Sequence, residues 1–104
     1  MAELSRRAEA AGADALWATD HLFWPHPIAE PLTTLAVAAV ATARTSLGTC
    51  VLQLPLRQPA AVAKQATALQ MLSGGRFVLG LGVGSHEAEY TRAGGASALS
   101  LIHI

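Results

Sequence analysis

Hydrophobic residues along the chain fall into short continuous runs and longer periodic stretches. Residues 77–84 read Phe-Val-Leu-Gly-Leu-Gly-Val-Gly, with no alternation of apolar and polar positions. Such a run predicts a strand covered on both faces, as in a parallel sheet flanked by helices. Residues 14–19 and 46–54 predict two further strands on the same grounds.

Helical stretches separate these strands. After Pro31, apolar residues recur at helical spacing up to position 43, and a second such stretch runs from Pro59 to the turn Ser-Gly-Gly at 73–75. Residues 2–11 and 87–92 predict two more helices. The alternation of helix and strand predicts an α/β fold built from βαβ units, in one domain or a piece of one.

The carboxyl ends of the three strands are expected to meet at one edge, because crossover connections have a single hand. That edge collects Asp20 and His21, the end of residues 50–54, and residues 82–86. Ligands of parallel α/β proteins bind at this edge. The glycines at 80, 82 and 84 lack side chains there, which favours close approach by a ligand; packing within the sheet is the alternative.

Composition narrows the class of protein. The 104 residues are 52% hydrophobic, and seven basic residues balance seven acidic ones. A chain without excess positive charge is not expected to bind nucleic acid or a membrane surface. The apolar stretches are also too short to cross a membrane. A single cysteine excludes an internal disulfide, so a cytoplasmic protein is expected. The short chain also suggests a fragment of a larger protein.

Several known motifs are absent. Ser85 occupies the last position of a possible G-x-G-x-x-G, so the dinucleotide fingerprint is not met. His86 and Glu87 begin like a zinc-protease helix, but position 90 is Tyr. His21 lacks a His-x-His partner, so no metal site is expected, and a metal-dependent barrel hydrolase is the third alternative.

His21 is the best chemical candidate, because an imidazole at a strand end can exchange a proton near neutral pH; a structural capping role is the alternative. Trp24 lies in the loop facing the predicted site and could wall a flat ring system. Trp17, inside a strand, is expected in the core. Cys50 is expected to be buried and inert. Arg57 is expected to be solvated in its loop, and contact with an anion is the alternative.

Six segments together carry a resemblance to a known family. They are Ala-Asp-Ala-Leu-Trp-Ala-Thr-Asp-His at 13–21, Glu-Pro-Leu-Thr-Thr-Leu at 30–35, Leu-Gly-Thr-Cys-Val-Leu at 47–52, Pro-Leu-Arg-Gln-Pro at 55–59, Leu-Ser-Gly-Gly-Arg-Phe at 72–77 and Gly-Leu-Gly-Val-Gly at 80–84. In this order and spacing they resemble the luciferase-like monooxygenase family. The resemblance covers residues 1–94, as an N-terminal part of that domain, whereas residues 95–104 depart from it.

The resemblance implies a partial (β/α)8 TIM barrel of about three βα units. It also implies a flavin- or deazaflavin-dependent oxidoreductase or monooxygenase that acts on a small organic substrate. Reduced FMN or the deazaflavin coenzyme F-420 would bind at the carboxyl ends of the strands. The alternative is a non-catalytic, truncated half-barrel without cofactor. Because half a barrel exposes two strand edges, pairing into a homodimer is expected.

The resemblance also assigns roles. His21 matches a catalytic histidine that faces the reactive ring. Asp20 precedes it in the same motif and is expected to belong to the cofactor-binding site, where it helps to orient the loop. Cys50–Val51 falls at a non-prolyl cis peptide that supports one face of the ring, and Gly82 and Gly84 match glycines beside it.

Two further positions bear on the match with the family. Ser85 stands where many family members have Trp. Those members also have an acidic residue a few positions further on, and Glu89, followed by Tyr90, keeps that residue here.

Overall fold

The computed structural model describes residues 1–94, in which helices and short strands alternate. The elements are α1 (Ala2–Ala10), β1 (Ala15–Ala18), α2 (Pro31–Ala41), β2 (Ser46–Thr49), β3 (Leu52–Gln53), the 3-10 turn η1 (Leu54–Leu56), α3 (Pro59–Leu72), β4 (Phe77–Val78), β5 (Leu81–Gly82) and α4 (Glu87–Ala93). Each predicted helix is present, with ends that differ from the prediction by a few residues at most. The predicted departure from the family at residues 95–104 lies outside the described residues.

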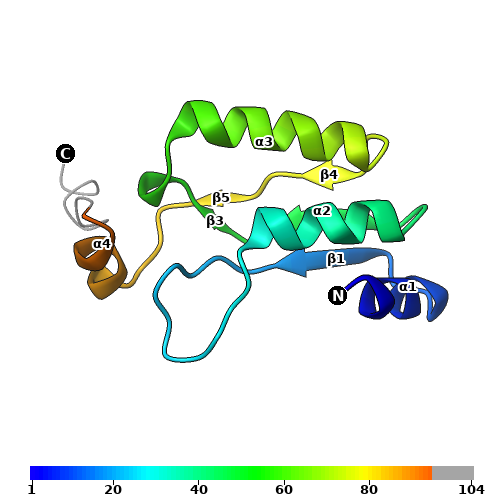
Figure 1. Ribbon diagram of the computed structural model, residues 1–104, viewed down its shortest axis with the longest axis horizontal. Helices are drawn as coiled ribbons and strands as arrows, with labels where there is room; N and C mark the ends of the chain where they lie inside the picture. The colour runs from blue at the N-terminus through cyan, green and yellow to red at the C-terminus, as the bar shows by residue number, and fades with distance from the viewer. Residues whose placement is uncertain (95–104) are drawn as a thin grey trace.

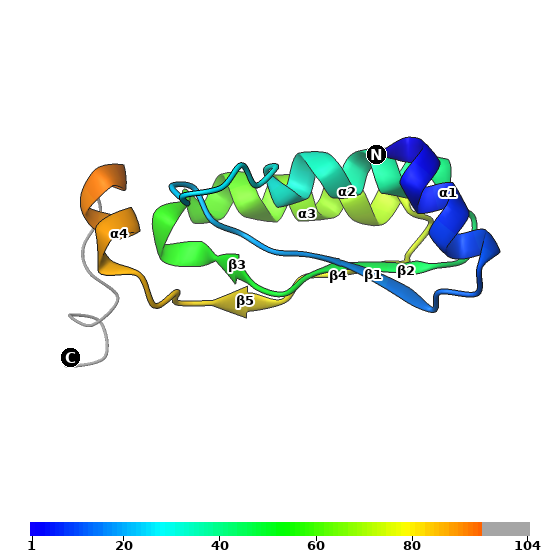
Figure 2. The same cartoon turned by 90° about the horizontal axis from the view of Figure 1, so that it is seen from below.

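All strand pairings are parallel, as predicted. β1, β2 and β4 form a three-stranded sheet in that order, and β3 pairs with β5 further along. Figure 2 shows the two sheets following one another below the helices. The crossovers run through α2 and α3, as the βαβ alternation predicts.

The prediction of single strands at 46–54 and 77–84 is wrong in detail, because each run is divided in two. At the division, the Thr49 hydroxyl donates to the Gly80 carbonyl at 2.8 Å and accepts from the Gly80 N–H at 3.0 Å. At this point the Thr49 side chain therefore takes the place of a backbone–backbone hydrogen bond between the strands. Pairing resumes where the Leu52 N–H donates to the Gly80 carbonyl at 2.7 Å.

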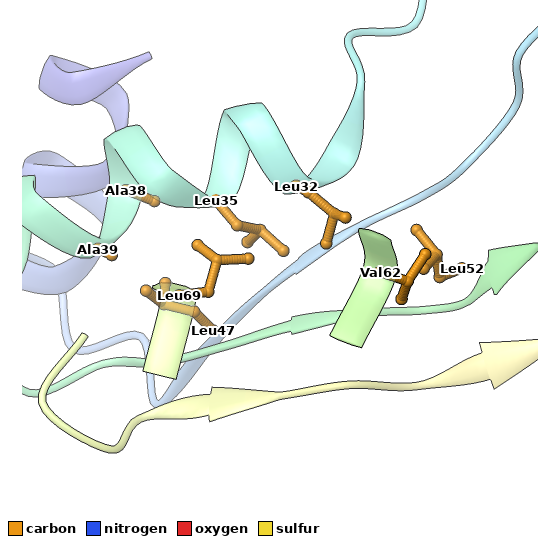
Figure 3. Packing of buried hydrophobic residues seen from close by; sticks show 8 residues of the cluster. All are labelled: Leu32, Leu35, Ala38, Ala39, Leu47, Leu52, Val62 and Leu69. Carbon is orange, nitrogen blue, oxygen red and sulfur yellow. The ribbon is translucent and has the colours of Figure 1, made fainter. Parts of the chain in front are cut away.

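Helices α2 and α3 cover one face of the sheet (Figures 1 and 2). The core lies between these layers, with Leu47 of β2 near Leu35 of α2 and Leu69 of α3 (Figure 3). The buried cluster consists of Leu32, Leu35, Ala38, Ala39, Leu47, Leu52, Val62 and Leu69.

Side-chain caps fix where these two helices begin. The Glu30 carboxylate accepts from the Thr33 N–H at 2.6 Å ahead of α2, and the Gln58 side chain accepts from the Ala60 N–H at 2.7 Å ahead of α3. A proline opens each helix, where its missing N–H costs no bond.

The opposite face of the sheet carries Trp17, whose predicted place in the core is wrong. Trp17, Gly48 and Val78 lie side by side in register, and the Trp17 ring covers Gly48. Alternation along β1 directs Leu16 toward the helices and Trp17 away from them. No described element covers this face, so Trp17 is 56% exposed. Among the described helices, none has the length and apolar character to cross a membrane.

Candidate functional site

The loops that follow β1, β3 and β5 meet at one end of the molecule, beside α4 (Figure 1). A cavity of about 200 Å³ opens there. It is lined by Thr19, Asp20, His21, Cys50, Val51, Gln53, Gly84 and Ser85. The fold thus brings together most of the predicted site residues, from segments far apart in sequence.

A larger hollow of about 330 Å³ lies elsewhere, between α1, β1 and α2. Its lining is mainly apolar, with Leu4, Trp17 and Ile28 among its residues. None of the predicted site residues lines it. The smaller cavity at the strand ends is therefore the candidate functional site.

His21 is held by Glu89, a residue of α4 that is 68 positions away in sequence. The distance from His21 Nδ1 to Glu89 Oε2 is 2.8 Å, and the Phe23 N–H donates to Glu89 Oε1 at 3.1 Å. The Glu89 side chain is 2% exposed and the His21 side chain 26% exposed. One buried carboxylate therefore fixes both the imidazole and the loop that carries it.

The state of Glu89 decides which nitrogen of His21 is free. Burial acts to raise the pKa of Glu89, but the hydrogen bonds from His21 and Phe23 outweigh burial and hold that pKa below its ordinary value. An ionised carboxylate can only accept, so His21 Nδ1 carries a proton. Nε2 is then the nitrogen available for chemistry: an acceptor in the neutral ring and a donor in the protonated one.

Two more rings surround His21. The Trp24 ring stacks on His21 with centroids 4.1 Å apart, and His86 stands edge-on to both rings. Trp24 and His86 also line a neighbouring hollow of about 350 Å³, together with Phe23, Pro25, Ala88, Glu89 and Arg92. Trp24 therefore lies between the histidine and a space that a small molecule can enter.

Asp20 lies beneath the cavity, with a side chain 1% exposed. Its carboxylate accepts from the Gln53 N–H at 2.8 Å and from Arg57 Nη2 at 2.7 Å. Arg57 also contacts Glu30 at 3.1 Å and is 13% exposed, so the predicted solvated role of Arg57 is wrong. Burial acts to lower the pKa of Arg57, but the contact with Asp20 outweighs it and raises that pKa. This buried network joins the loop after β1 to η1.

The peptide bond between Cys50 and Val51 is cis, as the family resemblance implies. It stands between β2 and β3, and both residues line the cavity. Cys50 is exposed, so the predicted buried, packing role of its side chain is wrong. Val51 is 41% exposed and offers an apolar surface at the site.

The glycines of the last strand accommodate the neighbouring strand. A Cβ atom at Gly82 would collide with the Val51 side chain, and one at Gly84 would collide with Gln53 Oε1. Gly84 also has φ of +75°, a conformation that favours glycine. The packing alternative for these glycines is therefore present in the structure, and a part in ligand binding stays a prediction.

Gln53 and Tyr90 were not singled out for the site by the sequence. Within the described part of the chain, the buried Gln53 Oε1 and Tyr90 hydroxyl have no hydrogen-bond partner, and both lie near Gly84. Burial, and then the charge of Glu89, raise the pKa of Tyr90. Because buried polar groups normally have partners, these two atoms are candidates to contact a bound polar group.

Comparisons with known proteins show the family of the chain. The family model described as luciferase-like monooxygenase matches residues 1–100. The chain is 37% identical, over 97% of its length, to 4-hydroxyprotoasukamycin monooxygenase of Streptomyces nodosus subsp. asukaensis. It is 38% identical, over 81% of its length, to an F-420-dependent glucose-6-phosphate dehydrogenase of Amycolatopsis mediterranei. These matches span 30% and 27% of the two relatives.

A solved structure shares the fold. The oxygenating constituent of 3,6-diketocamphane monooxygenase from Pseudomonas putida, in complex with FMN, superposes with a TM-score of 0.83 at 24% identity. The match covers 89% of this chain and 26% of that one. With its parallel strands and covering helices, the described chain is thus a partial (β/α)8 barrel.

Proposed function

Because the chain belongs to the luciferase-like monooxygenase family, we propose that its strand-end site serves a flavin- or deazaflavin-dependent oxidoreductase acting on a small organic substrate. The observation that carries the proposal is the His21 imidazole, held by the buried Glu89 carboxylate at a cavity lined by Asp20 and Cys50–Val51. Relatives whose names include F-420 and FMN support reduced FMN or coenzyme F-420 as the cofactor.

The residues present fit such a cofactor. A flat, largely apolar ring needs a smooth apolar support and a few polar groups that fix its orientation. The exposed Val51 supplies the support, and Gln53, which lines the cavity and has an Oε1 unpaired among the described residues, supplies a polar group beside it. Gly82 and Gly84 leave room for the Val51 and Gln53 side chains at this end of the sheet.

A bound flavin or deazaflavin would supply the hydride or oxygen chemistry, and the protein would orient the reactants and exclude water. In this proposal His21 is the catalytic residue, exchanging a proton or donating a hydrogen bond through Nε2. Cys50–Val51 supports the ring through its backbone, and Trp24 walls the substrate space. Asp20 has a positioning role, because its carboxylate accepts hydrogen bonds that hold Gln53 and Arg57 in place below the cavity.

The open face of the sheet favours a second candidate function. Trp17 is 56% exposed and Val78 47% exposed, side by side in register. A non-catalytic half-barrel without cofactor would cover these side chains by pairing with a second chain. The first function needs a cofactor and the second does not, so the two are separable by binding.

The experiment is a titration of the purified chain with reduced FMN and with reduced F-420, followed by cofactor fluorescence, with light scattering to report pairing. The family function predicts saturable binding of one cofactor. It also predicts that Val51→Asp weakens binding, because it places a charge on the ring support, whereas His26→Ala, in the exposed loop, does not. Absence of binding to both cofactors by a folded, paired chain would favour the half-barrel alternative.

A further inference from the structure

We propose that His21, His86 and Glu89 form a binding site for one Zn²⁺ ion. The potential ligand atoms of the three side chains lie within 4.8 Å of one another. Two imidazoles and one carboxylate form a ligand set that zinc uses in proteins when a fourth position is left open. The ligands come from the loop after β1 and from the start of α4, so only the fold reveals the set.

The distances suit a small ion. Ligand atoms about 2.1 Å from a tetrahedral zinc ion are about 3.4 Å apart, so the widest pair here, at up to 4.8 Å, must close by up to roughly 1.4 Å. His21 Nδ1 and Glu89 Oε2, at 2.8 Å, are joined by the Nδ1 proton, so zinc would replace that proton and the two atoms would move slightly apart. His86 is exposed at the N-cap of α4, so its side chain can make the adjustment without disturbing buried neighbours.

The surroundings hold the ligands in place. Glu89 is buried, and its second oxygen accepts from the Phe23 N–H at 3.1 Å, an outer contact of the kind that orients metal ligands. His86 and Glu89 are three positions apart, so they project from the same side of α4. The fourth position would face the hollow of about 350 Å³ lined by Trp24 and Pro25, where water can enter.

The sequence pattern predicts no metal site here, for a specific reason. The zinc-protease helix motif needs a second histidine one turn after His86, and position 90 is Tyr. The missing imidazole is instead His21, 65 positions before His86, stacked edge-on to it with ring centroids 5.8 Å apart. Because His21 is also the proposed catalytic residue, zinc and catalysis would compete for one side chain. Zinc binding can nevertheless be tested without a cofactor.

The test is calorimetric titration of the full chain with Zn²⁺, alongside the visible absorption of bound Co²⁺, both without flavin. We expect one ion per chain and a Co²⁺ spectrum of low coordination number. His86→Ala, at an exposed position, should weaken Zn²⁺ binding at least about tenfold. The controls His26→Ala and Glu87→Gln remove an exposed loop imidazole and an exposed carboxylate of α4, and should leave the affinity unchanged.

Glu89→Gln, checked for folding by circular dichroism, should weaken zinc binding as His86→Ala does. Absence of stoichiometric binding by the unmodified chain would overturn the proposal. So would binding that His86→Ala leaves intact, or that the control variants weaken equally. None of these outcomes depends on whether the chain binds FMN or F-420, so the proposal and the cofactor function fail separately.

Discussion

Nδ1 of His21 lies 2.8 Å from Oε2 of Glu89, across 68 positions of sequence. This contact joins the loop after β1 to α4, and among residues 1–94 no hydrogen bond engages the opposite ring nitrogen. The carboxylate is buried and ionised, so it fixes the tautomer of the ring as well as its position. Glu89 is therefore a positioning residue for the proposed chemistry.

Glu89→Gln tests whether Glu89 supports catalysis by fixing the tautomer of His21. The amide keeps the shape of the carboxylate but can donate as well as accept, so His21 would no longer be held in one tautomer. We expect turnover to fall at least about tenfold, as happens when a carboxylate that orients a catalytic imidazole becomes an amide. Ring ¹⁵N chemical shifts of His21 give a direct readout, with a mixture of tautomers replacing the Nδ1–H form.

Glu87→Gln is the matched control for that substitution, because it neutralises an exposed carboxylate on the same helix. If the ring shifts of His21 were identical in the Glu89→Gln variant and the unmodified chain, Glu89 would not set the tautomer.

His21→Ala tests the catalytic assignment itself. General acid–base catalysis contributes about 10²–10⁴-fold, so turnover with the bound cofactor should fall by at least about 10²-fold. Cofactor affinity should change much less, because the proposed ring support is Val51, another residue of the cavity lining. Fluorescence titration gives the affinity and single-turnover kinetics give the rate. Unchanged turnover would remove His21 from the mechanism.

The sequence predicted the layout of the fold because periodicity and glycine or proline positions decide it locally. The runs at 46–54 and 77–84 identified the strands, but not their division, which depends on the Thr49 hydroxyl contacting Gly80 across the sheet. Trp17 was misplaced for a related reason. An apolar residue in a strand predicts burial, but alternation directs Trp17 to a face that no described element covers.

The site was predictable in part. Strand ends located Asp20 and His21, and the family resemblance located the cis peptide at Cys50–Val51. The partners of these residues were not predictable, because they come from distant segments: Arg57 for Asp20, and Glu89 for His21. A charged residue that a single sequence shows on a loop or helix gives no sign of the buried partner it will meet.

Gly82→Ala should disturb the site through Val51. A Cβ atom at position 82 would collide with the Val51 side chain, so we expect a loss of about 1–3 kcal/mol in the free energy of unfolding. Val51→Ala removes the colliding methyl groups, so the double variant should lose less stability than the sum of the single ones. Urea unfolding of the four proteins measures this coupling. Additive losses would show that the collision does not limit this position.

Arg76→Lys should destabilise the chain by weakening the contact of Arg76 with the end of α2 and the segment before β2. The Arg76 guanidinium donates to the carbonyls of Ala39 at 2.9 Å, Thr42 at 3.0 Å and Thr45 at 2.7 Å, and to the Thr42 hydroxyl at 2.8 Å. These include carbonyls at the end of α2, which have no partner inside the helix. A lysine ammonium cannot reach them all at once.

We expect Arg76→Lys to lower the free energy of unfolding by roughly 2–4 kcal/mol, measured by urea titration with circular dichroism. Arg6→Lys is the control, because the Arg6 side chain is 58% exposed and its one ion pair lies at 3.7 Å. Equal stability of the two variants would mean that the guanidinium contacts contribute nothing beyond charge.

Glu9 should make the stability of the chain sensitive to acid. Its carboxylate, at the end of α1, accepts from the N–H groups of Ala43, Arg44 and Thr45, and these backbone bonds lower the pKa of Glu9 to about 2. The folded pKa lies below the ordinary value of 4.5, so the stabilisation is complete above pH 4.5 and is lost as the pH falls toward 2. Glu9→Gln removes this contribution.

Urea unfolding of the unmodified chain and of Glu9→Gln, measured from neutral pH down to about pH 2, should show a difference in the free energy of unfolding. This difference should be widest near neutral pH and should narrow between pH 4.5 and about 2. Glu3→Gln, which removes a carboxylate 74% exposed on the same helix, should give little gap at any pH. A gap for Glu9→Gln that stayed constant down to the lowest pH would mean that the lost packing or amide geometry, and not the ionised carboxylate, accounts for the difference. The acid dependence therefore distinguishes an anchoring charge between α1 and β2 from a side chain that merely fills space.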